Sequence, residues 1–109
     1  MMDGRVSCRV RARSVPVIPQ ALDYADEFLL TAAAQRNRNH TGPFVRFEGV
    51  PFAMEEVLFD PQTSGGLLIA LGAEEAEDLL RDLREAGAPA AIVGEILERR
   101  EPEILVVNE

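Results

Sequence analysis

The sequence contains no lysine: all eleven basic residues are arginines. A Walker-type phosphate loop and a Schiff-base enzyme both require lysine, so this chain alone supports neither chemistry. The single cysteine, Cys8, excludes an internal disulfide and a metal site built from several thiolates. The only histidine, His40, has no second histidine and no cysteine beside it, so we do not expect it to bind a metal. The sequence also lacks a Ser/His/acid set and a GxGxxG motif.

The charge is strongly acidic. The formal net charge is -8, which argues against nonspecific binding to nucleic acid or to anionic membranes. No apolar run approaches the length needed to span a membrane, and the N-terminus lacks a signal-peptide pattern. We therefore expect a cytoplasmic protein whose partners include neither nucleic acid nor a membrane.

The length of 109 residues predicts a single domain, residues 1–109, and the hydrophobic content of 47% is enough for a core. The first predicted strand begins only a few residues into the chain. We expect such a start in a domain cut out of a larger protein.

The first half of the chain predicts a strand followed by a helix. Val6–Ala12 alternates between apolar and polar residues, which is typical of a half-exposed strand. Cys8 lies on the apolar face, so a buried and inert thiol is expected. Pro19 suits a first helical turn, and the apolar spacing predicts a helix over about Gln20–Ala33. The polar stretch Gln35–Pro43 predicts a surface loop.

The second half predicts further strands and helices. The expected strands are Phe44–Glu48, Ala90–Leu97 and Glu103–Val107, the last two antiparallel to each other. The expected helices are a short one over Pro51–Leu58 and a longer one over Ala73–Ala86. Gly87 is expected to stop the longer helix, and Glu77 and Arg81 to form an i,i+4 ion pair on its exposed face.

The stretch Asp60–Leu71 joins a polar loop to an apolar run. The run Leu67–Leu71 is bounded by glycines, which predicts a strand buried on both faces. In the loop, Gly65 and Gly66 can adopt positive φ. Such a loop, with free N–H groups and the hydroxyls of Thr63 and Ser64, could receive an anion, or it could be a tight structural turn. Both readings stay open on the residues alone.

These elements together predict an α+β fold made of α/β layers, a mixed β-sheet of about five strands with helices packed on it. The residues alone lead no further than an acidic α/β domain with one Gly-paired polar loop.

A contiguous run, Asp60–Ala70, closely resembles a signature of the selenide, water dikinase (selenophosphate synthetase) family. Residues 6–30 resemble the segment upstream of that signature, and residues 74–96 resemble the last helix and strand. The similarity extends from about Gly4 to Val107. It implies the fold of the C-terminal domain of aminoimidazole ribonucleotide synthetase-like proteins, truncated at its N-terminal end.

The resemblance also implies a reaction. The family enzyme makes selenophosphate from selenide, ATP and water, and releases AMP and phosphate. Its reactive Cys or selenocysteine, its essential Lys and most of its Mg-binding aspartates belong to an N-terminal domain. The resemblance therefore implies no catalytic residue, no metal ligand and no cofactor in this fragment, with ATP and Mg bound only in the full enzyme. We expect no activity from the chain alone.

The implied partner is the missing N-terminal ATP-binding domain, and a homodimer is expected if an apolar face stays uncovered. The residues expected to line the phosphate-bearing cleft, or only to dock the two domains, are Asp60, Gln62, Thr63, Ser64, Gly65 and Gly66. Arg36 and Asn37 fall where the family has an Arg-Asn pair after a Gly-rich turn. Here that turn reads Thr31–Ala34, whose alanines are expected to extend the preceding helix, so the pair is a weaker candidate.

Two alternatives stay open. The chain could belong to a related ATP-dependent synthetase or phosphotransferase of the same superfamily, or it could be a stand-alone binding domain. An upstream coding sequence with a Gly-rich segment carrying Cys and Lys would exclude the stand-alone domain.

Overall fold

The computed structural model describes residues 4–62 and 65–109. Its centre is a mixed sheet of the strands β1 (Val6–Arg11), β2 (Val45–Glu48), β3 (Gly94–Glu98) and β4 (Ile104–Val107). Within these ranges the strand order is β2-β4-β1-β3. Strand β1 pairs parallel with β4 and antiparallel with β3, and β2 pairs parallel with β4. The predicted mixed sheet is confirmed, with four strands in the described residues instead of about five.

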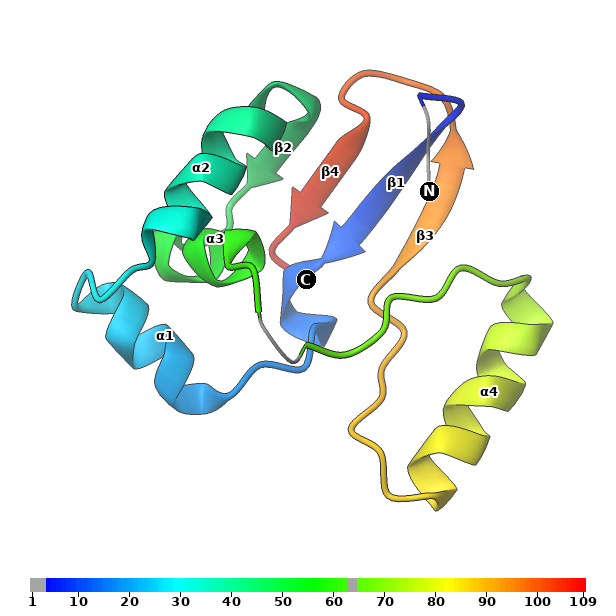
Figure 1. Ribbon diagram of the computed structural model, residues 1–109. Helices are drawn as coiled ribbons and strands as arrows, with labels where there is room; N and C mark the ends of the chain where they lie inside the picture. Colours follow the sequence, from blue (N-terminus) through cyan, green and yellow to red (C-terminus); the bar gives the residue numbers. More distant parts are fainter. Residues whose placement is uncertain (1–3, 63–64) are drawn as a thin grey trace.

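Three helices lie together beside the sheet (Figure 1): α1 (Pro19–Asp26), α2 (Ala32–Thr41) and α3 (Phe52–Phe59). Helix α3 packs against both α1 and α2. A small core of Ala12, Met54 and Val106 forms where the sheet meets these helices. Val10 and Phe47 are each in register with Val106. Because side chains alternate between the two faces along a strand, these three apolar side chains lie on the same face of the sheet.

The first predicted helix, Gln20–Ala33, is wrong. Helix α1 starts at Pro19 as expected, but it ends at Asp26. The N–H of Leu29 donates to Tyr24 O at 2.9 Å and the N–H of Phe28 donates to Ala25 O at 3.0 Å. These two bonds form a Schellman motif, in which Phe28 adopts the left-handed φ of 60°.

The polar loop expected over Gln35–Pro43 is also wrong, because most of it belongs to α2. Thr31 is the N-cap of this helix, and its Oγ1 accepts a hydrogen bond from the N–H of Ala34 at 3.0 Å. Capping by threonine and the high helix propensity of three alanines explain why a new helix starts here. The alanines begin a second helix and do not extend the first.

The buried strand expected over Leu67–Leu71 is absent from the described structure, where residues 65–72 are in no helix or strand. Leu67 is 90% exposed and Leu68 is 71% exposed. A strand needs a neighbouring edge for its backbone hydrogen bonds, and this segment pairs with none of the described strands. The apolar run indicates a segment suited to burial, but it does not identify the surface that would bury it.

Helix α4 (Ala73–Glu85) agrees with the prediction but lies apart from the other helices (Figure 1). Its last residue is Glu85, and Gly87 follows the C-cap Ala86 as the predicted stop residue with a φ of 83°. The expected Glu77–Arg81 pair is wrong, because Arg81 Nη2 contacts Asp78 Oδ1 at 2.9 Å instead.

The two C-terminal strands are shorter than predicted, since β3 starts at Gly94 and β4 at Ile104. They run antiparallel as expected, but they do not pair, because β1 lies between them. A short connection between two strands in the sequence does not show that a third strand lies between them in the sheet.

Gly94 gives a test of the β1–β3 pairing. A Cβ at this position would lie well inside van der Waals contact with the carbonyl oxygen of Arg9. We predict that Gly94→Ala lowers the free energy of unfolding by about 1–3 kcal/mol, the usual effect of overpacking. Urea denaturation measures it. The control is Gly42→Ala, because a Cβ there meets nothing within 4 Å and the φ of -50° is open to any residue. Equal stability of the two variants would contradict the observed pairing.

Candidate functional site

The structure brings together the two segments that carry the predicted site residues. Asn37, on α2, donates from Nδ2 to the carbonyl oxygen of Phe59 at 2.8 Å. Thr31, which caps the same helix, donates from Oγ1 to Asp60 Oδ1 at 2.8 Å. Helix α2 is therefore fastened at two points to the end of α3, where the loop beginning at Asp60 leaves the helix.

Arg38 is the strongest link between these two helices. Its Nε donates to Glu56 Oε1 at 2.8 Å and its Nη1 to Glu55 Oε2 at 2.9 Å, while Nη2 also contacts Glu56 Oε1. Its Cζ lies 4.8 Å from the ring centroid of Phe59 and 5.5 Å from that of Phe52. We call these five residues the Arg38 clamp. Burial alone would lower the pKa of Arg38, but the hydrogen bonds to Glu55 and Glu56 raise it, so the guanidinium stays charged.

Glu56 explains why the clamp matters to the fold. Its side chain is only 3% exposed, and its Oε2 has no hydrogen-bond partner among the described residues. A buried carboxylate is strongly unfavourable unless it is paired, so Glu56 depends on Arg38. The sequence reasoning missed both residues. The available signal was a charged pair, Glu55-Glu56, inside an otherwise apolar helix.

The loop itself is open to solvent where it is described. Asp60 is half-buried, while Gln62, Gly65 and Gly66 are exposed. A Cβ on Gly65 would approach the Gln62 side chain at 3.3 Å, and one on Gly66 would meet nothing within 4 Å. Thr63 and Ser64 lie outside the described residues.

Gly66 can adopt a positive φ but does not do so here, because the described glycines with positive φ are Gly4, Gly49 and Gly87. The φ of Gly65 is defined in part by the carbonyl carbon of Ser64, which lies outside the described residues.

Arg36 and Asn37 are neighbours in sequence but differ in environment. Asn37 faces α3, whereas Arg36 is exposed and makes no hydrogen bond or ion pair within the described residues. His40 is exposed on the same helix. No group of three His, Cys, Asp or Glu residues in the described parts of the chain could hold a metal ion. Asn37 therefore links α2 to α3, whereas the guanidinium of Arg36 is available to a ligand.

Cys8 lies on β1 opposite Ile96 and Ile104 and is partly buried. Burial, and secondarily the charge of Glu103, raise the pKa of its thiol. A thiol with a raised pKa is a poor nucleophile, in line with the expected inert residue.

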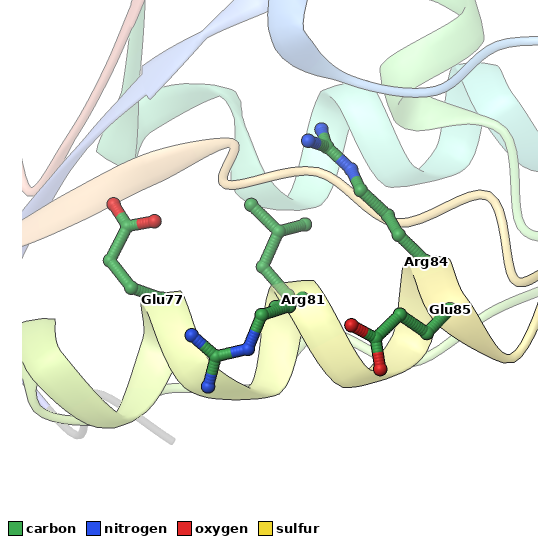
Figure 2. A pocket seen from close by; sticks show the side chains of 5 residues that line it. Glu77, Arg81, Arg84 and Glu85 are labelled. Atoms are coloured by element: carbon green, nitrogen blue, oxygen red, sulfur yellow. The ribbon is translucent and has the colours of Figure 1, made fainter.

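The hollows on α4 do not form a binding site. One is lined by Glu77, Leu80, Arg81, Arg84 and Glu85, which all project from this single helix (Figure 2). Arg84 Nε donates to Ala90 O at 3.2 Å, and Arg81 is paired with Asp78. A second hollow lies at the start of the helix, where Glu75 Oε2 accepts from the N–H of Gly72 at 3.2 Å. Both hollows lie along a single helix, and Arg81, Arg84 and Glu75 beside them already have partners.

A search of the helices in the described residues finds none long and apolar enough to cross a membrane.

The comparisons with known proteins agree on one family. Residues 1–107 match the model described as AIR synthase related protein, C-terminal domain. A selenide, water dikinase from Agathobacter rectalis is 55% identical over 107 residues, and one from Desulfitobacterium hafniense is 42% identical over 106. A third, from Clostridioides difficile, is 35% identical over 106 residues.

These matches cover 97%, 97% and 95% of this chain, but only 31%, 31% and 30% of the relatives. The chain therefore spans less than a third of the length of the curated relatives it matches.

The Arg38 clamp leads to a prediction about stability. Replacing Arg38 by methionine removes the partner of a buried carboxylate, so we expect Arg38→Met to lower the free energy of unfolding by about 3–5 kcal/mol. Combining it with Glu56→Leu should recover much of the loss, which a double-mutant cycle in urea would measure. Arg81→Met is the matched control, because the Arg81 and Asp78 side chains are 62% and 68% exposed and such pairs contribute about 0–1 kcal/mol. Similar losses in Arg38→Met and Arg81→Met would contradict the role given to the clamp.

Proposed function

This chain belongs to the AIR synthase related proteins as their C-terminal domain, and we propose that it serves as the C-terminal domain of a selenide, water dikinase. The observation that carries the proposal is the fixed placement of the segment beginning at Asp60. That segment resembles the family signature, and its first residue, Asp60, accepts a hydrogen bond from Thr31, while Asn37 donates to the preceding residue, Phe59. Identity of 55% over 97% of the chain to a protein of that name supports it.

The proposed reaction is that of the whole enzyme: ATP, selenide and water give selenophosphate, AMP and phosphate. This chain has no lysine, and no group of three His, Cys, Asp or Glu among its described residues could hold a metal ion. The reacting groups and the metal site would therefore belong to an N-terminal domain, so this chain acts by binding and positioning. ATP is a substrate that both domains would enclose.

The geometry supports this positioning role. The exposed residues Gly65 and Gly66 offer backbone N–H groups to an anion, whereas the N–H of Gln62 already donates to Asp60 O at 3.1 Å. The Arg38 clamp fixes the helix from which the loop departs. The exposed guanidinium of Arg36 adds a positive charge on the neighbouring helix α2. Donors of this kind, held in place before the substrate arrives, stabilise charge on phosphate oxygens without reorganisation.

A second candidate is a related ATP-dependent synthetase, because the family model is that of AIR synthase related proteins in general. The two functions differ in one requirement, since only a selenide, water dikinase needs selenide to consume ATP.

The proposal predicts that the chain alone does not form AMP from ATP and selenide. It also predicts that activity appears when the chain replaces the matching C-terminal part of the Agathobacter rectalis relative. AMP formation with and without selenide is the measurement. In this chimera we expect Gly65→Val to lower the rate, because a side chain there would displace Gln62, whereas Gly42→Ala should leave it unchanged.

Two results would count against the proposal. Formation of AMP from ATP and selenide by the isolated chain would contradict the assignment of the reacting groups to an N-terminal domain. A folded chimera that consumes ATP without selenide would favour the related synthetase.

A further inference from the structure

Two helices of this chain end in the same hydrogen-bonded motif but with different residues. At the end of α4, the N–H of Gly87 donates to Arg84 O and the N–H of Ala88 to Leu83 O, the pattern that Phe28 and Leu29 form at the end of α1. Gly87 has a φ of 83° and Phe28 has a φ of 60°. Glycine is the usual residue at this position, and a bulky residue there is strained. Helix termination alone therefore explains Gly87 but not Phe28.

Phe28 also gains little by burial within this chain, because it is 74% exposed. Its ring contacts Phe52 with the centroids 6.1 Å apart, and Phe52 is itself 49% exposed. Leu29 is 64% exposed and Tyr24 is 55% exposed. These four residues, which we call the corner patch, present large apolar side chains to solvent at the end of α1 and the start of α3.

The corner patch shares a rigid frame with the candidate site. Phe52 lies against Arg38, so one aromatic ring belongs to both the patch and the clamp. Thr31, three residues after Phe28, holds Asp60. A partner bound to the patch would therefore lie at a fixed position relative to the loop that begins at Asp60.

The rim of the patch is acidic. Asp23, Asp26 and Glu27 are exposed, and within the described residues none of these carboxylates takes part in an ion pair or hydrogen bond. An apolar centre with an acidic rim fits a partner surface that has an apolar centre and basic side chains around it.

We propose that the corner patch is the surface through which this domain docks on the N-terminal part of the same enzyme, with Phe28 as its anchor. The inference rests on the proposed function and adds the docking surface to it. The named relatives extend far beyond the matched region, since this chain accounts for 31% of the Agathobacter rectalis protein. In a longer chain of that kind, the part that binds the corner patch is covalently joined to this domain. Because the patch is held to α2 and α3, that part would lie beside the loop that begins at Asp60.

The decisive variant is Phe28→Gly, because docking and ordinary packing predict different outcomes. In the isolated chain, glycine relieves the backbone strain, so the midpoint of thermal unfolding should not fall. In the chimera with the Agathobacter rectalis N-terminal part, loss of the anchor should lower the selenide-dependent rate at least tenfold. It should also split a single thermal transition into two. Ile18→Ala is the matched control, since Ile18 is 72% exposed at the other end of α1 and should change neither measurement.

The outcomes separate the two proposals. An inactive chimera with the unchanged sequence contradicts the proposed function itself. An active chimera in which Phe28→Gly has no more effect than Ile18→Ala overturns the docking surface alone. A parallel loss of stability in the isolated chain would make Phe28 a packing residue and would also overturn it. If sedimentation shows a dimer of the isolated chain that Phe28→Gly dissociates while the chimera keeps its rate, the patch joins copies of this chain and the inference is wrong.

Discussion

A single charged side chain, Arg38, connects α2 to α3, the helix that leads into the segment resembling the family signature. Its guanidinium contacts Glu55 and Glu56 and lies close to the rings of Phe52 and Phe59, so one group joins α2 to α3 by ion pairing and by cation–π contact. Because Glu56 is almost fully buried, this arrangement tolerates little variation. The hydrogen bonds of Asn37 and Thr31 then fix the point at which the loop leaves α3.

The rest of the chain does not all pack against α2 and α3. The helices α1, α2 and α3 pack with the sheet, while α4 and the apolar segment Leu67–Leu71 lie outside that core (Figure 1). Large apolar side chains are exposed both there and in the corner patch. A domain that leaves this much apolar surface uncovered presents surface suited to contact with another part of a protein.

Most secondary structure followed from periodicity and capping signals, as the agreement over β1, α3 and α4 shows. The failures have physical causes. The end of α1 was missed because its C′ residue is Phe28 and not glycine, and α2 was missed because Thr31 was not read as a cap. The Leu67–Leu71 run indicated burial but could not identify the covering surface. The site was predictable as a motif at Asp60–Gly66, whereas the Arg38 clamp depends on the packing of two helices that the sequence did not place together.

The central claim is that the corner patch and the loop meet an N-terminal domain as one unit. Hydrogen exchange of the isolated chain, compared with exchange of the same residues inside the Agathobacter rectalis chimera, tests it most directly. We expect slower exchange in the chimera for the peptide covering residues 24–31 and for residues 65–71, with little change on β1 and β4, which are already paired. Identical exchange at residues 24–31 and 65–71 in the two proteins would contradict the account.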